Sequence, residues 1–154
     1  MDKNLEIDKV DLKILQILVN DAETPYTEVA KRVFVSDGTV HVRMKKLKEM
    51  GVVIGSQLNL DYSKLGWDIK AFIGIYLDRS SLYDDVVTEL KNIPEIVEMN
   101  YTTGSYSMFA KIICRDTQHL RSVLHDKVQP IRGIQRTETL ISLEDSILRN
   151  IQML

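Results

Sequence analysis

Apolar residues change their spacing once along this chain of 154 residues, at the turn-like segment Asp61–Gly66. Before that segment they recur every three or four positions, which is the period of one face of a helix. After it, short apolar runs alternate with helical patterns, as in a domain that mixes strands and helices. The sequence therefore predicts an α+β protein with a helical domain in residues 1–60, a linker in 61–68 and a second domain in 69–154.

Three helices are predicted in the first domain. Asp8 or Asp11 can cap the first helix, and a short second helix follows. Ser36 is a good N-cap for the third helix, which we expect to run to about Met50. Gly51 comes next, at a position where glycine readily adopts positive φ. Helices joined in this way by a tight turn describe a helix-turn-helix unit.

The third helix is basic, although the whole chain has a formal net charge of −2. From Lys31 to Lys48 there are six basic residues and one acidic residue. Because phosphate affinity depends on where the cations lie, this stretch favours binding to nucleic acid; a solvated helix face is the alternative. The β-rich segment Val52–Leu60 that follows is expected to form a wing or a linker strand.

At about 100° per residue, the third helix places Val40, Met44 and Leu47 on one inward stripe and its polar residues outside. The outward Val42 can meet thymine methyl groups, or can be one ordinary exposed side chain. Outward cations can equally bind phosphates, and such contacts position a protein on DNA without recognising its base sequence. The residues expected to contact DNA are Ser36, Gly38, Thr39, His41, Val42, Arg43, Lys45 and Lys46.

The second domain is predicted to have the element order βαββαβ. Strands are expected at 69–77, 96–103, 108–114 and 134–143, with helices at 82–92 and 117–128. This is the ferredoxin-like arrangement, an antiparallel sheet with helices on one face. The last segment, 144–154, has apolar residues in a polar background and is expected to pack on a partner subunit.

Several function classes lack the residues that they need. No apolar run approaches the ~20 residues of a membrane span, and the N-terminus has no secretory signal, so a cytoplasmic protein is expected. The one cysteine, Cys114, excludes an internal disulfide and is expected to be a buried, inert thiol. The three histidines do not share a helix face, so no metal site is expected. Without a nucleophile motif, P-loop or dinucleotide fingerprint, no enzyme and no cofactor are expected.

The residues resemble a known family, the Lrp/AsnC feast-or-famine transcription regulators, over about Ile7 to Ile151. The third-helix and effector-loop pieces look closer to the asparagine-responsive branch than to the leucine-responsive one. Each piece is weak alone, but together, in order and on the predicted elements, they are specific. The pieces are Asp11–Leu15, Val35–Arg43, Gly51–Gly55, Leu65–Asp68, Tyr101–Ser107 and Gln135–Leu140.

This resemblance implies a winged helix-turn-helix domain that reads DNA and an effector domain that dimerises through its sheet. It implies that dimers assemble into tetramers, octamers or larger rings, and that a small amino acid binds between dimers. Asparagine is the first candidate for that effector, with leucine and methionine behind it. The residues expected to line the effector site are Tyr101, Thr103, Gly104, Tyr106, Ser107, Gln135, Thr137 and Thr139.

The chemistry of these residues fits an amino acid. A glycine such as Gly104 lets backbone N–H groups approach a carboxylate, and small hydroxyls can complete its hydrogen bonds. From the residues alone, a simple hairpin turn at Gly104–Ser107 is the favoured interpretation, and the resemblance reverses that weighting. For Thr137 and Thr139 the alternative is an ordinary polar strand face.

The predicted function is a regulator without enzymatic activity that binds a roughly palindromic double-stranded operator as a two-fold dimer. An amino acid would modulate its activity or its assembly, and octamers are expected by resemblance. The rival hypothesis is a metabolite-binding module or a small-ligand enzyme on the ferredoxin-like fold, because fold alone does not determine function. A steep loss of DNA affinity with salt would distinguish the regulator from this rival.

Overall fold

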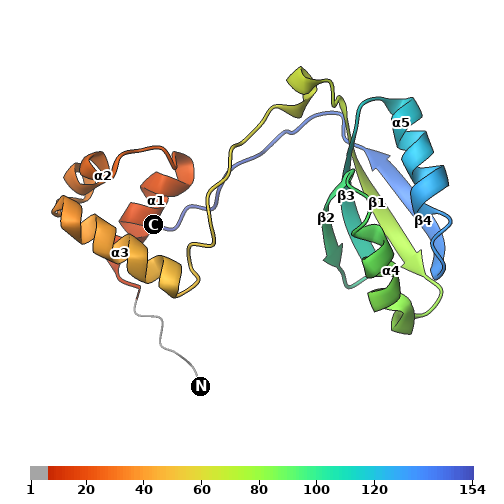
Figure 1. Ribbon diagram of the computed structural model, residues 1–154, viewed down its shortest axis with the longest axis horizontal. Helices are drawn as coiled ribbons and strands as arrows, with labels where there is room; N and C mark the ends of the chain where they lie inside the picture. Colours follow the sequence, from red (N-terminus) through yellow and green to blue (C-terminus); the bar gives the residue numbers. More distant parts are fainter. Residues whose placement is uncertain (1–6) are drawn as a thin grey trace. The chain divides into compact units, whose positions relative to one another are not determined.

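The computed structural model describes residues 7–154, and contacts divide the chain into two compact units. One unit ends at Asn59 and also includes Ile147–Leu154, and the other is Leu60–Ser146. Each unit has a hydrophobic core of its own. The first unit contains the helices α1 (Lys9–Asn20), α2 (Tyr26–Val33) and α3 (Asp37–Glu49) (Figure 1).

The N-terminal caps of α1 and α3 are the ones that the sequence predicts. The Asp8 carboxylate accepts a hydrogen bond from the backbone N–H of Asp11 at 2.8 Å, and the Asp11 carboxylate accepts one from the backbone N–H of Asp8 at 3.1 Å. Ser36 Oγ accepts the backbone N–H of Thr39 at 3.2 Å. These bonds satisfy amides that the first turn of a helix leaves without partners. Beyond α3, Gly51 has a φ of 73°, as expected.

All three helices of this unit contribute to its core. Val40, Met44 and Leu47 of α3 are buried, which confirms the stripe predicted from helical spacing. The residues from α1 and α2 that pack in the same cluster are Ile14, Leu15, Val29, Ala30 and Val33. Burial of this stripe determines which face of α3 remains exposed.

The strand expected in Val52–Leu60 is not formed, and within residues 7–154 every strand lies in the second unit. Ile54 is 96% exposed, and Leu58 is exposed as well. β-propensity measures how well a side chain fits a half-buried sheet surface rather than a backbone preference. With no neighbouring strand to pair with, the β-rich sequence stays irregular.

The second unit has the predicted βαββαβ order. Its strands are β1 (Ile69–Leu77), β2 (Ile96–Tyr101), β3 (Met108–Cys114) and β4 (Ile134–Ile141), and its helices are α4 (Tyr83–Leu90) and α5 (Thr117–Ser122). Short 3₁₀ turns, η1 (Tyr62–Leu65) and η2 (Ser80–Leu82), precede β1 and α4, and α5 continues as a π-type segment, η3 (Val123–Val128). Neighbouring strands are antiparallel, in the order β2-β3-β1-β4.

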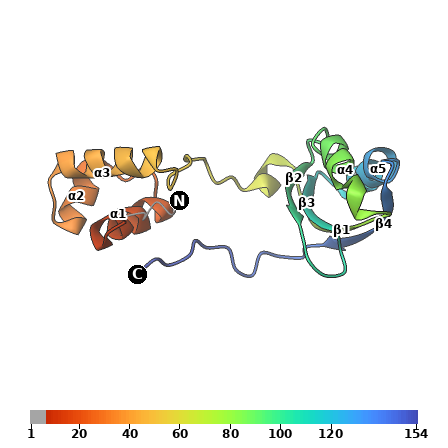
Figure 2. The ribbon, with the colours of Figure 1, turned by 90° about the horizontal axis from the view of Figure 1, so that it is seen from below.

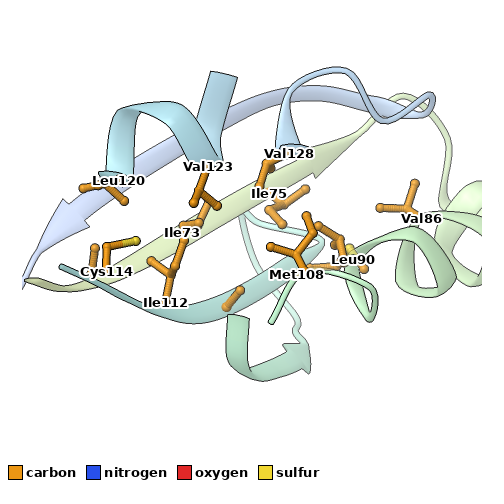
Figure 3. Packing of buried hydrophobic residues seen from close by; sticks show 13 residues of the cluster. Ile73, Ile75, Val86, Leu90, Met108, Ile112, Cys114, Leu120, Val123 and Val128 are labelled. Carbon is orange, nitrogen blue, oxygen red and sulfur yellow. The ribbon is translucent and has the colours of Figure 1, made fainter. Parts of the chain in front are cut away.

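Both helices of the second unit cover the same face of the sheet (Figures 1 and 2). Ile73 and Ile75 of β1 and Ile112 of β3 lie in this layer, where they pack with helix residues such as Val123 (Figure 3). This arrangement confirms the ferredoxin-like fold. The alternating residues of β1, including Phe72, lie on the opposite face, which no helix of the described chain covers.

The C-terminal segment Ile147–Leu154 belongs to the first unit, whereas residues 69–154 were predicted to form the second domain. The Asn150 side-chain amide donates to the backbone oxygen of Val19 at 2.8 Å, and the backbone N–H of Met153 donates to Oε1 of Gln16 at 2.8 Å. Carbonyl groups in the last turn of α1 have no partner within the helix, and so they are available to such a segment. Packing of 144–154 on a partner subunit stays a prediction.

Candidate functional site

The residues expected to contact DNA lie on α3 and its N-cap. Those that are exposed are Ser36, Gly38, His41, Val42, Lys45 and Lys46, while Thr39 is half-buried. Val42 is 70% exposed, so the outward valine inferred from helical spacing is confirmed as a surface residue. The face opposite the buried stripe therefore combines one large apolar side chain with cations.

The Ser36 and Thr39 side chains make hydrogen bonds with one another and with the first turn of α3. Their hydroxyl oxygens lie 2.8 Å apart, in addition to the cap bond between Ser36 Oγ and the Thr39 amide. Asp37 follows in the first turn, where a carboxylate complements the helix dipole. These contacts fix the direction in which α3 begins.

Arg43 is the half-buried cation of α3, and its guanidinium binds two carboxylates near the start of α1. Its Nη1 donates to Asp8 Oδ2 at 2.7 Å and to Asp11 Oδ1 at 2.8 Å. The side chain is 27% exposed, and that of Asp11 is 1% exposed. The bonds to Asp11 and Asp8 raise the pKa of Arg43, while the Asp11 amide and Arg43 lower the pKa of Asp8.

The structure thus pairs Arg43 with the start of α1 and leaves its side chain partly exposed, and its contact with DNA stays a prediction. The guanidinium joins α3 to the start of α1, and two carboxylates oppose its charge. The sequence signal was available: the acids that cap α1 are three residues apart and attract a cation from a neighbouring helix. Helical projection alone cannot find such a partner, because it contains no information about the next helix.

Tyr26 is a half-buried residue of this unit that helical spacing did not indicate. Its ring meets the His41 ring edge-on, with centroids 4.7 Å apart. Together with Val42 and Lys45, these residues border a surface hollow of about 450 Å³. The N-terminal end of α2 therefore joins the exposed face of α3.

Four of the eight expected effector residues, Thr103, Gly104, Tyr106 and Ser107, lie in the hairpin turn between β2 and β3. The backbone N–H of Thr102 donates to the backbone oxygen of Ser107 at 3.2 Å, so β2 ends before the predicted residue 103. The Ser107 amide donates in turn to the oxygen of Ile75 in β1 at 2.9 Å. Thr103 and Gly104 lie at the exposed tip; Gly104 has a φ of 99°, and open space surrounds the position of a Cβ. The tip can thus approach a ligand closely with its backbone.

Tyr106 does not point into that open space but folds back over β1. A Cβ on Gly74 would lie 2.3 Å from its ring, so the glycine leaves the room that the ring occupies. The Tyr106 hydroxyl donates to Glu138 Oε2, and this bond raises the pKa of the phenol. The ring also contacts Tyr76 and Phe109, at centroid distances of 5.2 and 5.8 Å. These neighbours lie on the sheet face that no helix covers.

The remaining effector candidates lie elsewhere on the sheet. Thr137 pairs with Ile75 and Thr139 with Ile73, so both threonines share the helix-facing side of β4. Gln135 is exposed and lies at the register shift of β4, where Leu77 pairs with Ile134. Tyr101 is on β2, at the other edge of the sheet, where its ring lies 4.3 Å from that of Tyr83 in α4.

One copy of the chain therefore does not bring the eight expected effector residues together. The turn, the β2 edge and the β4 edge are separate places on the fold, and Tyr106 packs on the opposite face from Thr137 and Thr139. A cleft that uses all of them requires more than one copy. A groove of about 1260 Å³ in this unit is lined by other residues, among them Arg79, Asp85 and Arg132.

Other chemistry is sparse in the part of the chain that the structure describes. No group of three His, Cys, Asp or Glu residues in 7–154 is arranged to hold a metal ion. None of the described helices has the length and apolar character to cross a membrane.

Cys114 is buried, as expected, and burial raises the pKa of its thiol to about 11. Glu95 is buried too, and although burial opposes its charge, the Lys127 ammonium at 2.7 Å holds its pKa below the usual value.

Comparison with known proteins gives matches along nearly the whole chain. A family model described as a winged helix-turn-helix DNA-binding domain matches residues 7–54, and one described as the Lrp/AsnC ligand-binding domain matches residues 70–150. Regulatory protein AsnC of Haemophilus influenzae is 47% identical over 146 residues, which cover 95% of this chain and 97% of that protein. The solved structure of Escherichia coli AsnC superposes with a TM-score of 0.90 at 42% identity, covering 95% of this chain and 98% of the other.

A more distant structure shows the fold alone. It is a transcriptional regulator from Neisseria meningitidis, solved as a complex with L-Met, with a TM-score of 0.89 at 22% identity. The match covers 93% of this chain and 94% of the other. The backbone arrangement is thus retained where about four-fifths of the residues differ.

Proposed function

This chain belongs to the Lrp/AsnC family of transcription regulators, and on that premise we propose how it binds DNA and which ligand controls it. It has a helix-turn-helix DNA-binding domain and an amino-acid-binding domain of that family. Its relatives at 42–47% identity are named regulatory proteins, which gives no support to the rival hypothesis of an enzyme.

We propose that the exposed face of α3 enters the major groove of duplex DNA. The observation that carries this proposal is the division of α3 into a buried stripe and an exposed face that includes Val42, Lys45 and Lys46. The lysines would contact phosphates, and Val42 would meet base edges such as thymine methyl groups. The cap at Ser36 would present the start of the helix, with Gly38, Thr39 and His41, to the duplex. Arg43 is left out of this set, since Asp8 and Asp11 already bind it.

We propose further that the regulator acts in the cytoplasm as a two-fold dimer, on a roughly palindromic operator. Two copies related by a two-fold axis present two α3 helices to two half-sites. The uncovered sheet face supports self-association, because it carries Phe72 and Phe109, stacked at 5.7 Å, and the half-exposed Leu140. Dimers would assemble further, with an octamer as the expected size.

The effector is proposed to be a free amino acid, with asparagine as the first candidate and leucine and methionine behind it. The open tip at Thr103 and Gly104 can offer backbone N–H groups to a carboxylate. Because the other expected residues, such as Thr137, lie on separate parts of the sheet, the site would be completed between copies. Binding between dimers would couple the amino acid to assembly or to DNA affinity.

Two measurements test these proposals. First, a duplex is selected from a random-sequence pool with the wild-type protein, and its affinity is measured by fluorescence anisotropy at increasing salt. We expect a steep linear fall of log affinity against log salt, with a slope of about 0.9 for each phosphate contact. Failure to select any duplex, or an affinity that salt leaves unchanged, would contradict DNA binding by α3.

Second, a thermal-shift screen of the twenty common amino acids identifies the effector, since a ligand that binds only the folded state raises Tm. The same preparation, measured by light scattering with and without the amino acid, gives the assembly size. A monomer of 17.7 kDa at micromolar concentration would contradict the proposed dimer.

A further inference from the structure

Phe34, between α2 and α3, combines two features that a chain normally avoids. Its φ of 59° and ψ of 48° place it in the left-handed region, and it is the one non-glycine residue with positive φ among residues 7–154. Its side chain is also 93% exposed. Glycine usually occupies such a position at the C-terminal end of a helix, because a Cβ is disfavoured there.

The backbone contacts explain why residue 34 is left-handed, but they do not explain why it is a phenylalanine. The Phe34 amide donates to the oxygen of Ala30 and so closes α2. Val33 before it is buried, and Val35 after it packs against the same core. The left-handed residue lets the chain turn while both valines reach the core. A glycine would do this with less strain, so the turn gives no reason for a phenyl ring.

The position of Phe34 gives such a reason. It is two residues before Ser36, the N-cap of α3, and it follows the cations Lys31 and Arg32 of α2, which are exposed. When a helix-turn-helix docks, the N-terminal part of its second helix contacts base edges and the first helix crosses the backbone. The turn between these helices then lies against the duplex.

We propose that the Phe34 ring is a DNA contact, which packs on thymine methyl groups or deoxyribose at the rim of the groove entered by α3. This inference rests on the proposed DNA binding of α3 and adds an apolar contact to it. Phenylalanine is among the side chains that make apolar contact with the thymine methyl group. Lys31 and Arg32, which precede Phe34 in α2 and are exposed, favour a polyanion as the partner, although Arg32 also binds Glu28. Strain and exposure in the free protein would be compensated when the ring becomes buried against DNA.

Two substitutions separate a DNA contact from a structural role. Both Phe34→Gly and Phe34→Ala remove the ring, but only Phe34→Gly relieves the left-handed strain. We expect both variants to bind the selected duplex roughly fivefold more weakly, as for loss of a half-buried aromatic contact. We expect Tm to rise by roughly 1–3 °C in Phe34→Gly and not in Phe34→Ala. A variant that is more stable and yet binds DNA less well cannot be explained by misfolding.

The salt dependence supplies an independent readout. An apolar contact releases no counterions, so the slope of log affinity against log salt should be the same in Phe34→Ala and the wild type. In Lys45→Ala, by contrast, the slope should fall by about one. Leu143→Ala is the matched control, because Leu143 is 96% exposed but lies in the second unit. Its DNA affinity should not change.

The outcomes distinguish the inference from the function on which it rests. If the wild type selects no duplex, the proposed DNA binding itself is wrong. If the wild type binds and Phe34→Gly and Phe34→Ala bind within twofold of it, the DNA contact of Phe34 is overturned. A change of assembly size in Phe34→Ala, measured by light scattering, with DNA affinity unchanged would instead assign the ring to an interface between copies.

Discussion

The two units of this chain organise their candidate sites differently. In the first unit, the proposed DNA-binding residues lie on one helix and its cap, between Ser36 and Lys46. In the second unit, the expected effector residues are distributed over a turn and two opposite edges of a sheet. The residues that share one helix face can be found from helical spacing within one sequence segment. A site across a sheet depends on strand register, on which face each side chain occupies, and on whether a second copy of the chain contributes residues. A single sequence segment does not contain that information.

Arg43 and Tyr106 sharpen this contrast, because each is expected to touch a ligand and each is held by contacts within its own unit. Arg43 binds two carboxylates of the first unit, and Tyr106 covers Gly74 and bonds to Glu138 in the second. Both side chains support the surface beside them. Their variants should therefore act on stability before they act on ligand binding.

The largest effect is expected for Arg43→Met. This change leaves the buried carboxylate of Asp11 without its cation, which should lower the free energy of unfolding of the first unit by ~2–4 kcal/mol. Thermal and urea unfolding followed by circular dichroism measures this loss, with the exposed Lys45→Met as the control. Full stability together with weakened DNA binding would return Arg43 to the set of DNA contacts.

A double variant tests whether the loss in Arg43→Met comes from this ion pair. Asp11→Asn removes the charge of the partner, so Arg43→Met combined with Asp11→Asn should cost less than the sum of the two single changes. Strict additivity would mean that the two side chains do not stabilise one another.

The next effect concerns the open turn of the second unit. Gly104→Val places a branched side chain at a φ of 99° and in the space by which an effector would approach the backbone. We expect affinity for the amino acid to fall at least tenfold, while DNA binding without effector is unchanged. Calorimetric titration with asparagine, leucine and methionine measures this. Equal heats from wild type and variant would move the effector site away from the turn.

A smaller effect is expected for the exposed lysines of α3. Lys46→Ala should lower affinity for all DNA sequences alike and reduce the salt slope by about one if the ammonium contacts phosphate. If it reads a guanine edge instead, the loss should be ~1–3 kcal/mol and limited to one base position. Gel shifts on the selected duplex and on a scrambled one decide between these contacts. No change on either duplex would remove Lys46 from the interface.

The smallest effect is a pH dependence that arises in the first unit. The Asp11 amide and the Arg43 guanidinium hold the pKa of Asp8 below its usual 3.8. A carboxyl whose pKa is lowered on folding stabilises the fold above its unfolded pKa, and this stabilisation is lost as pH falls through the folded pKa. Tm should therefore decline below about pH 4, and decline less in Asp8→Asn, which keeps a capping side chain. Identical profiles would show that Asp8 contributes nothing to acid stability.

Local signals in the sequence determined much of this protein. Helical spacing predicted the buried stripe of α3, the cap residues Asp8 and Ser36 were visible as residue types, and the βαββαβ order followed from the change of period. Each of these depends on residues close together in the chain, through hydrogen bonds or side-chain direction within one element. The helix-turn-helix and the basic stretch also favoured binding to nucleic acid, whereas the amino-acid effector came from the resemblance to the Lrp/AsnC family.

Only the tertiary structure decided which expected contacts are internal and which surfaces remain available. Pairing of Arg43 with Asp8 and Asp11 joins residues 35 and 32 positions apart, and the ring of Tyr106 lies on Gly74 of another strand. Val52–Leu60 has the composition of a strand but pairs with no strand of residues 7–154 in this copy. These contacts depend on which elements become neighbours in space. The sequence of one segment does not show which residue of another segment will contact its side chains or its strand edges.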